Sequence, residues 1–316
     1  MSTVTKPILK DETGIRIAQA IENLKAKPFT DNMKNAILNV LSKVAFIDEN
    51  GQEYIEDLAD VFFADGVLSI SAVFTQPSGD ITTETPLNNL KSNLVVTATM
   101  QDQTTVTVAP EEYTLSGTLT GGKSTVTVEY SGKTTTFDCL VVYELAEATA
   151  FDGTNKVLTG WQTAYAEKLS ICGDITLTSY TGGGTADMIF STIVGSEANY
   201  VGLCARLTAQ GAYELWGAGI TYSNRSGNIT GANERIRFVA VVDTTTNNIN
   251  MNFYNVTNAV TRTRSNTYTD ALAIEHEISI GKPSASYAGF IGTANNFKVY
   301  GRELTSGEIS QYLGGN

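Results

Sequence analysis

The sequence predicts a mainly β protein in which a short helical segment precedes two sandwich modules. Charged residues make up only 17% of the 316 residues. Thr, Ser, Gly and Asn fill the stretches between short apolar alternations, which is typical of exposed antiparallel sheets. Because a single hydrophobic core seldom grows beyond ~250–300 residues, a chain of this length favours two or three domains.

The first part of the chain resists a β interpretation and predicts three short helices. Asp11 can cap the first helix, which ends before Lys27-Pro28 because proline lacks an amide hydrogen and restricts the residue before it. A turn at 48–51 separates a second helix from a third, which is expected to begin at Tyr54. The apolar stripe of the second helix has helical spacing, and its members are Met33, Ala36, Ile37, Val40, Leu41 and Val44.

Three short helices bury little surface alone, so their apolar faces need a neighbour. We expect copies of the same chain to supply it, in a homo-oligomer for which a trimer is favoured. The alternative is a small intramolecular bundle that caps the next module, because short hydrophobic stripes do not fix an oligomer number. The segment 1–64 is therefore predicted to serve attachment or oligomerisation.

From Gly66 the apolar period changes from helical to two. Turn signals at 76–79 and 120–122 separate the predicted strands. The spacing suits an immunoglobulin-like sandwich over 65–145. The residues expected to share one face of each strand are Leu68, Ile70, Ala72 and Phe74; Leu94, Val96, Ala98 and Met100; Val126, Val128 and Tyr130; and Phe137, Cys139, Val141 and Tyr143.

Several runs of this region carry a family resemblance, namely 67–74, 94–99, 113–119 and 131–137. They resemble bacterial Ig-like repeats and cover nearly the whole module. Asp102-Gln103-Thr104 departs from the Asp-Gly-Thr of those repeats, so a wider hairpin is expected there. The run 43–54 is similar to the helical leader that precedes such modules in structural proteins of phages infecting Gram-positive gut bacteria. The resemblance implies a virion protein, assembled in the host cytoplasm.

The last part of the chain, 146–316, opens with Phe151-Asp152-Gly153-Thr154 and closes with a strand that leads into a short helix. Thr305 and Glu308 form a capping box for that helix. Its apolar face is expected to lie against a sheet and consists of Ile309, Tyr312 and Leu313. This order resembles laminin-G-like, concanavalin-A-like jelly rolls, the fold of many lectins. The alternating runs in between are enough for two stacked sheets, and they are 171–177, 188–193, 200–207, 237–242, 249–254 and 277–280.

A lectin-like fold implies carbohydrate binding, which requires exposed rings with amides and charged groups around them. Two glycine-rich stretches carry such rings. The alternative is that Trp216 anchors the core, since tryptophan is highly buried on average, and that Tyr180 is an ordinary loop residue. The predicted carbohydrate-binding residues are Tyr180, Trp216, Tyr222, Asn224, Arg225 and Asn228.

No cofactor is predicted, although several members of this sandwich family hold a calcium ion. Asp152, Asp187 and Asp243 are calcium ligands by type, yet each also suits a plain turn, and no acidic loop has EF-hand spacing. We therefore name no metal ligands. The three cysteines match neither a disulfide framework nor a zinc site, and we interpret Cys139, Cys172 and Cys204 as reduced core residues.

The net charge of −12 disfavours nucleic acid and membrane surfaces as partners, because such binding depends on Lys and Arg releasing counterions. No stretch approaches the ~18 apolar residues of a membrane span. Met1–Gly14 carries charges and a proline where a secretory signal would need an apolar core. The expected partners are cell-surface or mucosal glycans and other virion proteins.

The sequence does not predict an enzyme. Glycosidases of this fold carry an E-x-D-x-x-E strand pattern, which is missing here. Glu275 and Glu277 share one strand face, but that is also the normal polar face of a half-exposed strand. His276 is the only histidine, and no G-x-S-x-G elbow accompanies it. The glycine run 181–185 lacks the lysine of a phosphate-binding loop.

Three functions stay open at this point. The first is a virion adhesin, of the tail-fibre, baseplate-fibre or receptor-binding type, whose last module touches glycan. The second is a capsid decoration or head-fibre protein with a mainly structural role. The third is a glycan hydrolase, which the fold permits.

Overall fold

The computed structural model describes residues 46–47, 53–54, 66–101, 103–145, 147–179, 187–193, 201–207, 213–218, 225–267, 276–283 and 287–314. The helices predicted within 1–64 lie outside these ranges. Two short strands in that segment, β1 (Phe46–Ile47) and β2 (Glu53–Tyr54), pair antiparallel, with Phe46 opposite Tyr54. Tyr54 therefore belongs to a hairpin and does not start a helix, because the turn signal at Asn50-Gly51 favours strand pairing on both sides of it.

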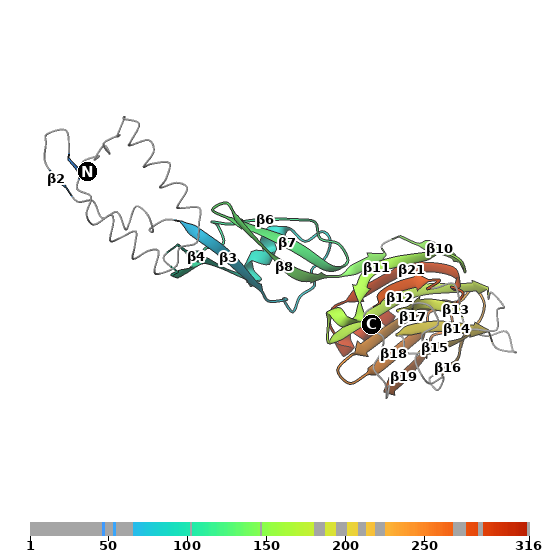
Figure 1. Ribbon diagram of the computed structural model, residues 1–316. Helices are drawn as coiled ribbons and strands as arrows, with labels where there is room; N and C mark the ends of the chain where they lie inside the picture. Colours follow the sequence, from blue (N-terminus) through green and yellow to red (C-terminus); the bar gives the residue numbers. More distant parts are fainter. Residues whose placement is uncertain are drawn as a thin grey trace. The chain divides into compact units, whose positions relative to one another are not determined.

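The described residues form two compact units, which Figure 1 shows in sequence colours. The first unit contains residues 66–75, 87–116 and 127–137, and the second contains 76–86, 117–126 and 138–314. Three segments of the predicted Ig-like region, 76–86, 117–126 and 138–145, thus belong to the second unit. The predicted domain limits after residues 64 and 145 stay predictions.

The Ig-like region consists of two three-stranded sheets and a 3-10 helix at Leu87–Asn93. The predicted alternation is confirmed, since Leu94, Val96 and Ala98 are buried along one strand and Val126 and Val128 along another. One sheet has the order β3 (Val67–Phe74), β4 (Leu94–Met100), β5 (Thr105–Val108), and the other β6 (Thr114–Ser116), β7 (Gly122–Tyr130), β8 (Lys133–Val141).

The hairpin between β4 and β5 is tighter than the sequence suggested. The amide of Met100 donates to the carbonyl of Thr104 over 2.8 Å, which leaves a three-residue connection. Gln103 takes a φ of +70°, the left-handed conformation that closes such short loops. The glutamine thus adopts a left-handed conformation, and the three-residue connection closes without a wider loop.

The second unit contains a seven-stranded and a six-stranded sheet, and most of their strands are labelled in Figure 1. All six alternating runs predicted between its ends coincide with strands. The larger sheet has the order β10 (Thr149–Asp152), β21 (Ile291–Tyr300), β12 (Lys168–Ser179), β17 (Arg235–Asp243), β18 (Asn248–Asn255), β19 (Val260–Thr267), with β9 (Tyr143–Leu145) also pairing with β21. The smaller has the order β11 (Lys156–Gln162), β20 (Glu277–Gly281), β13 (Asp187–Ser191), β14 (Gly202–Leu207), β15 (Tyr213–Ala218), β16 (Arg225–Thr230).

One hydrophobic core joins the inner faces of these two sheets. Phe190 of the smaller sheet packs against Phe238 and Phe297 of the larger, with ring centroids 5.7 and 5.9 Å apart. Gly173 makes room for this cluster, because a Cβ there would lie 2.2 Å from the Phe238 ring. The protein is therefore mainly β, and its second unit is a sandwich of two stacked sheets, as predicted.

The terminal helix α4 (Ser306–Leu313) covers part of the outer face of the larger sheet. Thr305 accepts a hydrogen bond from the amide of Glu308, and the Glu308 carboxylate accepts one from the amide of Thr305. Leu313 is buried beside Cys172, with Ile309 and Tyr312 packed around them. The predicted capping box and apolar face are both confirmed.

Two cysteines, Cys139 and Cys172, are free and buried, as the sequence indicated. Cys204 lies in β14, and only its backbone is described. Among the described helices, none is long and apolar enough to cross a membrane.

Candidate functional site

The predicted carbohydrate residues fall partly on the β15–β16 pair at one edge of the smaller sheet. Trp216 lies in β15, and Arg225 and Asn228 lie in β16. The register sets Trp216 directly opposite Arg225, and Glu214 opposite Asn228. Tyr180, Tyr222 and Asn224 lie outside the described residues.

This register brings together residues that are nine positions apart in sequence. Directly opposite residues of antiparallel strands have Cα atoms ~4.5–5.5 Å apart, so the backbone holds positions 216 and 225 side by side. The ladder shifts register between Tyr213 and Glu214 and again between Glu214 and Trp216. Such irregularities bend a strand and are frequent next to binding sites. The sequence showed Trp216 beside Gly217 and Gly219, and the structure places it within strand β15.

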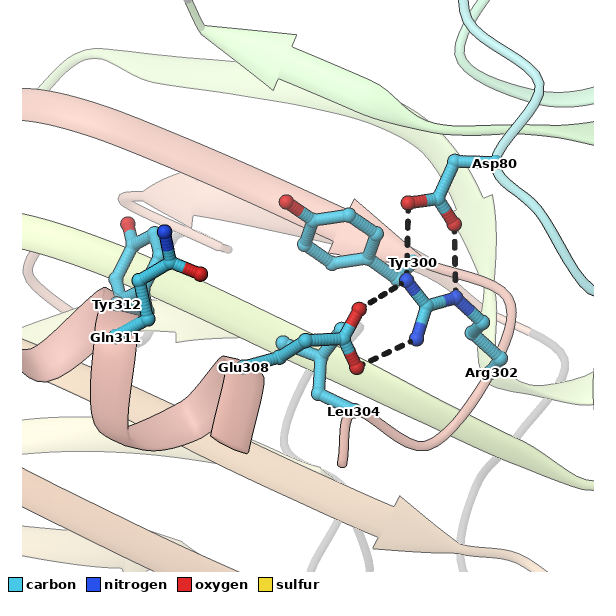
Figure 2. A pocket seen from close by; sticks show the side chains of 7 residues that line it. All are labelled: Asp80, Tyr300, Arg302, Leu304, Glu308, Gln311 and Tyr312. Atoms are coloured by element: carbon cyan, nitrogen blue, oxygen red, sulfur yellow. Dashed lines mark hydrogen bonds and ion pairs between the residues drawn. The ribbon is translucent and has the colours of Figure 1, made fainter. Parts of the chain in front are cut away.

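A second candidate site is a hollow of about 230 Å³ beside α4. Figure 2 shows a view in which the ion pairs of Arg302 lie at one end and Gln311 and Tyr312 at the other. The lining residues come from the segment 76–86, the end of β21, the connection to α4 and α4 itself. They are Asp80, Tyr300, Arg302, Leu304, Glu308, Gln311 and Tyr312.

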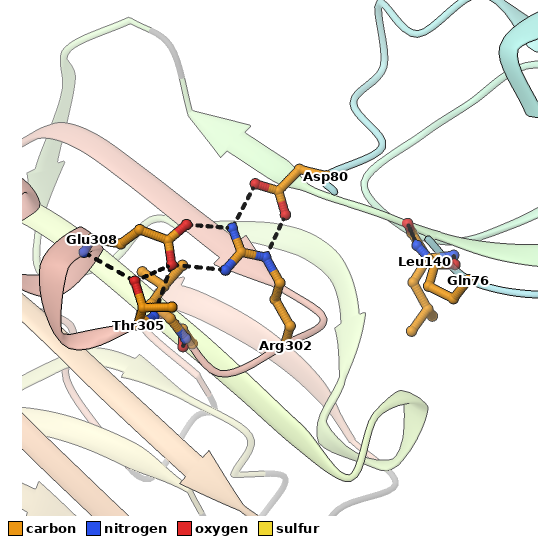
Figure 3. A network of polar contacts seen from close by, with 8 residues as sticks. Gln76, Asp80, Leu140, Arg302, Thr305 and Glu308 are labelled. Carbon is orange, nitrogen blue, oxygen red and sulfur yellow. Dashed lines mark hydrogen bonds and ion pairs between the residues drawn. The ribbon is translucent and has the colours of Figure 1, made fainter. Parts of the chain in front are cut away.

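Arg302 is held between two carboxylates (Figures 2 and 3). Its Nε and Nη2 donate to the two oxygens of Asp80 over 2.9 and 3.0 Å. Its Nη1 and Nη2 donate to the two oxygens of Glu308 over 3.0 and 2.7 Å. Arg302, helped by the amide of Thr305, lowers the pKa of Glu308 to about 2, and the two carboxylates raise the pKa of Arg302. Arg302 and Glu308 are therefore both charged at neutral pH.

Asp80 reaches this position because its segment is anchored on both sides. The Gln76 side chain accepts from the Leu140 amide over 2.9 Å and donates to the Leu140 carbonyl over 3.0 Å; both residues appear in Figure 3. On the other side of Asp80, the carbonyl of Ile81 accepts from the amide of Val142 over 2.7 Å. These backbone and side-chain hydrogen bonds attach the segment 76–86 to Leu140 and Val142 of the same unit.

Two tyrosine side chains, Tyr300 and Tyr312, form another part of the wall of the hollow. Burial raises the pKa of both Tyr300 and Tyr312, so both hydroxyls stay protonated. The hydroxyl of Tyr312 is buried and has no hydrogen-bond partner, although a buried polar group normally finds one. This oxygen is closed to solvent, so it offers no hydrogen bond to a ligand in the hollow.

The sequence contained only part of this second site. The capping-box pattern identified Glu308, and the apolar stripe of the terminal helix identified Tyr312. From the sequence, both residues had a structural role and no binding role. Asp80 and Arg302 lie 222 positions apart, and no local pattern links them. Arg302 itself gave no signal beyond its place before the capping box.

The carboxylates considered for calcium mostly serve the backbone. Asp152 accepts from the amides of Thr154 and Asn155, and Asp243 accepts from the amides of Thr245 and Thr246. Each of the two therefore closes its own turn and does not fit a shared calcium site. In the described ranges, no three His, Cys, Asp or Glu side chains gather as metal ligands would.

Of the two carboxylates considered for catalysis, the structure describes Glu277. Glu277 accepts a hydrogen bond of 2.5 Å from the amide of Gly160, so it stabilises the irregular pairing of β11 with β20. Glu275 lies outside the described residues.

Comparison with known proteins identifies one sequence family within the chain. The model of the bacterial Ig-like domain (group 3) matches residues 89–141. This agrees with the resemblance seen in the strand runs of that module. Comparison with curated proteins finds no sequence relative.

Several solved structures are similar in fold at low identity. The carbohydrate-binding module CBM40 of the Ruminococcus gnavus IT-sialidase, bound to α2,3 sialyllactose, is 14% identical, with 55% of this chain and 96% of that chain covered and a TM-score of 0.36. The NanB sialidase of Streptococcus pneumoniae is 11% identical over 54% of this chain, with a TM-score of 0.35. The match spans 27% of the length of that sialidase. A Lotus tetragonolobus seed lectin is 7% identical over 57% of this chain and 82% of that chain, with a TM-score of 0.30.

Proposed function

We propose that this chain is a non-enzymatic, glycan-binding adhesin of a phage virion, whose C-terminal sandwich contacts the sugar. The observation that carries the proposal is the register of β15 and β16, which sets Trp216 opposite Arg225 with Asn228 on the same strand as Arg225. An indole, a guanidinium and an amide at neighbouring backbone positions are the groups that sugar sites combine.

Binding without bond cleavage is supported by the use of Glu277. Retaining hydrolysis needs two free carboxyl groups ~5 Å apart. Glu277 instead accepts a backbone hydrogen bond from Gly160. The residues proposed for binding are aromatic, amide and cationic, and none of them is a general acid.

The virion role is supported by the order of the modules. The run 43–54 resembles the leader of phage structural proteins, and an Ig-like module follows it. A single shallow sugar site binds weakly, and several tethered copies raise the effective affinity by ~10²–10⁴. An oligomer formed through the segment 1–64, with a trimer favoured, supplies those copies.

A glycan array with the full-length protein tests the binding proposal. We expect specific hits that weaken at least about tenfold in Trp216→Ala, the loss typical of removing a stacking ring from a site. Arg225→Ala and Asn228→Ala should weaken the same hits. Circular dichroism of each variant shows whether it is folded.

Tyr130→Ala is the matched control, because it removes a partly buried ring from β7 of the Ig-like region. Its array profile should equal that of the wild type. A blank wild-type array would refute glycan binding and favour a capsid decoration or head-fibre role. Labelling of the protein on an intact particle tests whether the virion carries it.

A further inference from the structure

We propose that the hollow beside α4 is a second sugar site that takes one neutral pyranose ring. This inference rests on the proposed glycan-binding function but uses residues remote in sequence from Trp216. The lining residues that the structure describes come from other parts of the chain than β15 and β16.

The size of the hollow suits a single ring. Its volume of about 230 Å³ is smaller than the ~300–1,000 Å³ of pockets for drug-sized ligands and far larger than the ~30 Å³ share of one water molecule. A monosaccharide unit fits that range, and an oligosaccharide would have to continue into solvent.

The wall offers both donors and acceptors to a polyol. Each oxygen of Asp80 uses one acceptor position on Arg302 and has a second one left. Gln311 is exposed at the rim and carries an amide that can do both. The rings of Tyr300 and Tyr312 and the side chain of Leu304 supply the apolar surface that pyranose C–H groups need.

The charge of the site selects against acidic sugars. Two carboxylates surround one guanidinium, and Arg302 already donates to both of them. The lining therefore carries one excess negative charge, and no cation is left over to pair with a sugar carboxylate. A neutral hexose or N-acetylhexosamine is consequently favoured over a sialic or uronic acid.

The four hydrogen bonds of Arg302 also make the site preorganised. Asp80 and Glu308 are held in place before any ligand arrives, so little side-chain entropy is lost on binding. The capping box fixes Glu308 from the other side.

Methyl NMR on the full-length protein, labelled with ¹³C at its leucine methyl groups, reads this site directly. The probes are the methyl α-glycosides of glucose, galactose, mannose and N-acetylglucosamine, and that of N-acetylneuraminic acid. Leu304 lines the hollow, whereas Leu90 is buried in the Ig-like region. We expect at least one neutral glycoside to shift Leu304 saturably while Leu90 stays unchanged.

Gln311→Ala should weaken that titration by about tenfold, the equivalent of one hydrogen bond to the ligand. Ser310→Ala, an exposed position of the same helix outside the lining, is the matched control and should leave it unchanged. Asp80→Asn should also weaken binding, because it removes one acceptor oxygen and one ion pair.

Several results would overturn the inference. These are an unshifted Leu304 with all neutral probes, a titration that Gln311→Ala leaves intact, or tightest binding of the N-acetylneuraminic acid glycoside. A Leu304 shift that persists in Trp216→Ala supports a separate site. Because the array test depends on Trp216 and this test on Leu304, each proposal can fail without the other.

Discussion

Gln103 and Gly132 both take positive φ values at hairpins of the Ig-like region, +70° and +71°. The family resemblance pointed to position 103 because the repeats have glycine there. The sequence could not reveal that a glutamine would accept the same conformation, since that is decided by closure of the β4–β5 ladder. At Gly132 the Ser-Gly turn signal was read correctly.

Exchanging glycine at these two positions should have opposite effects. Gln103→Gly relieves a left-handed penalty of ~1–2 kcal/mol, offset by a glycine entropy cost of ~0.5–1 kcal/mol, so we expect a gain of about 0.5 kcal/mol in unfolding free energy. Gly132→Ala should cost about 1 kcal/mol, because alanine at this positive φ carries the left-handed penalty. A Cβ there would touch nothing, so no clash adds to that cost. Urea unfolding of both variants measures the difference, and a loss in Gln103→Gly contradicts the argument.

Trp161 anchors the core, the role that the sequence left open for Trp216. Its side chain is fully buried, and its indole N–H donates to the carbonyl of Val141 over 2.9 Å. The local pattern could not show this, because the acceptor lies twenty positions upstream.

Trp161→Phe should lower the unfolding free energy by about 2–4 kcal/mol, because it opens a cavity and leaves the carbonyl of Val141 unpaired. Denaturant titration measures the loss. Leu158→Ala on the same strand is the control: its side chain is 50% exposed, so the change should stay within ~0.5 kcal/mol. Equal losses in the two variants would refute the anchoring role.

At the scale of elements, predictability followed the apolar content. The run 249–254 alternates between apolar and polar residues and forms β18. The capping box predicted the start of α4. In contrast β16 (RSGNIT) and β19 (VTRTRSNT) have one apolar residue each and gave no periodic signal. They are strands because neighbouring strands pair with them along their length, which is a tertiary effect. Two of the predicted site residues, Arg225 and Asn228, lie in β16.

Helix α4 should lose support as the solution is acidified. The pKa of Glu308 falls from its usual 4.5 to about 2 in the folded protein, first through Arg302 and then through the Thr305 amide. A lowered folded-state pKa means that the stabilisation is complete above about 4.5 and is lost as the pH falls towards about 2. Glu308→Gln removes this dependence.

Melting temperatures measured across that pH window check this prediction. The melting temperature of the wild type should fall more steeply with decreasing pH than that of Glu308→Gln. The two curves should converge near the acid end of the window. Glu303→Gln is the control for a surface ion pair, because Glu303 binds the exposed Lys168. Parallel curves for the wild type and Glu308→Gln would contradict the assigned cause.

At the scale of the molecule, the second unit includes chain that the sequence assigned to the Ig-like module. The segments 76–86, 117–126 and 138–145 belong to it. They supply Asp80 to Arg302, the carbonyl of Val141 to Trp161, and strand β9 to β21. Alternation identified the strands but not this division, because a periodic pattern does not say which core a segment joins.

A fragment limited to 146–316 should therefore be less stable than the same unit in a longer chain. We expect its unfolding midpoint in urea to fall clearly below that of the fragment 65–316, which keeps all three contacts. Tryptophan fluorescence follows the transition, since Trp161 lies in this unit. Equal midpoints would show that these segments add nothing.

The thiol of Cys172 lies beneath α4, fully buried against Leu304 and Leu313. Burial raises its pKa, so very little thiolate is present at neutral pH, and reagents that attack thiolates have no access while the helix is seated. Alkylation of this sulfur therefore reports how often the C-terminal helix lifts from its sheet. The alkylation rate of Cys172 therefore measures how readily the structure opens beside the second sugar site.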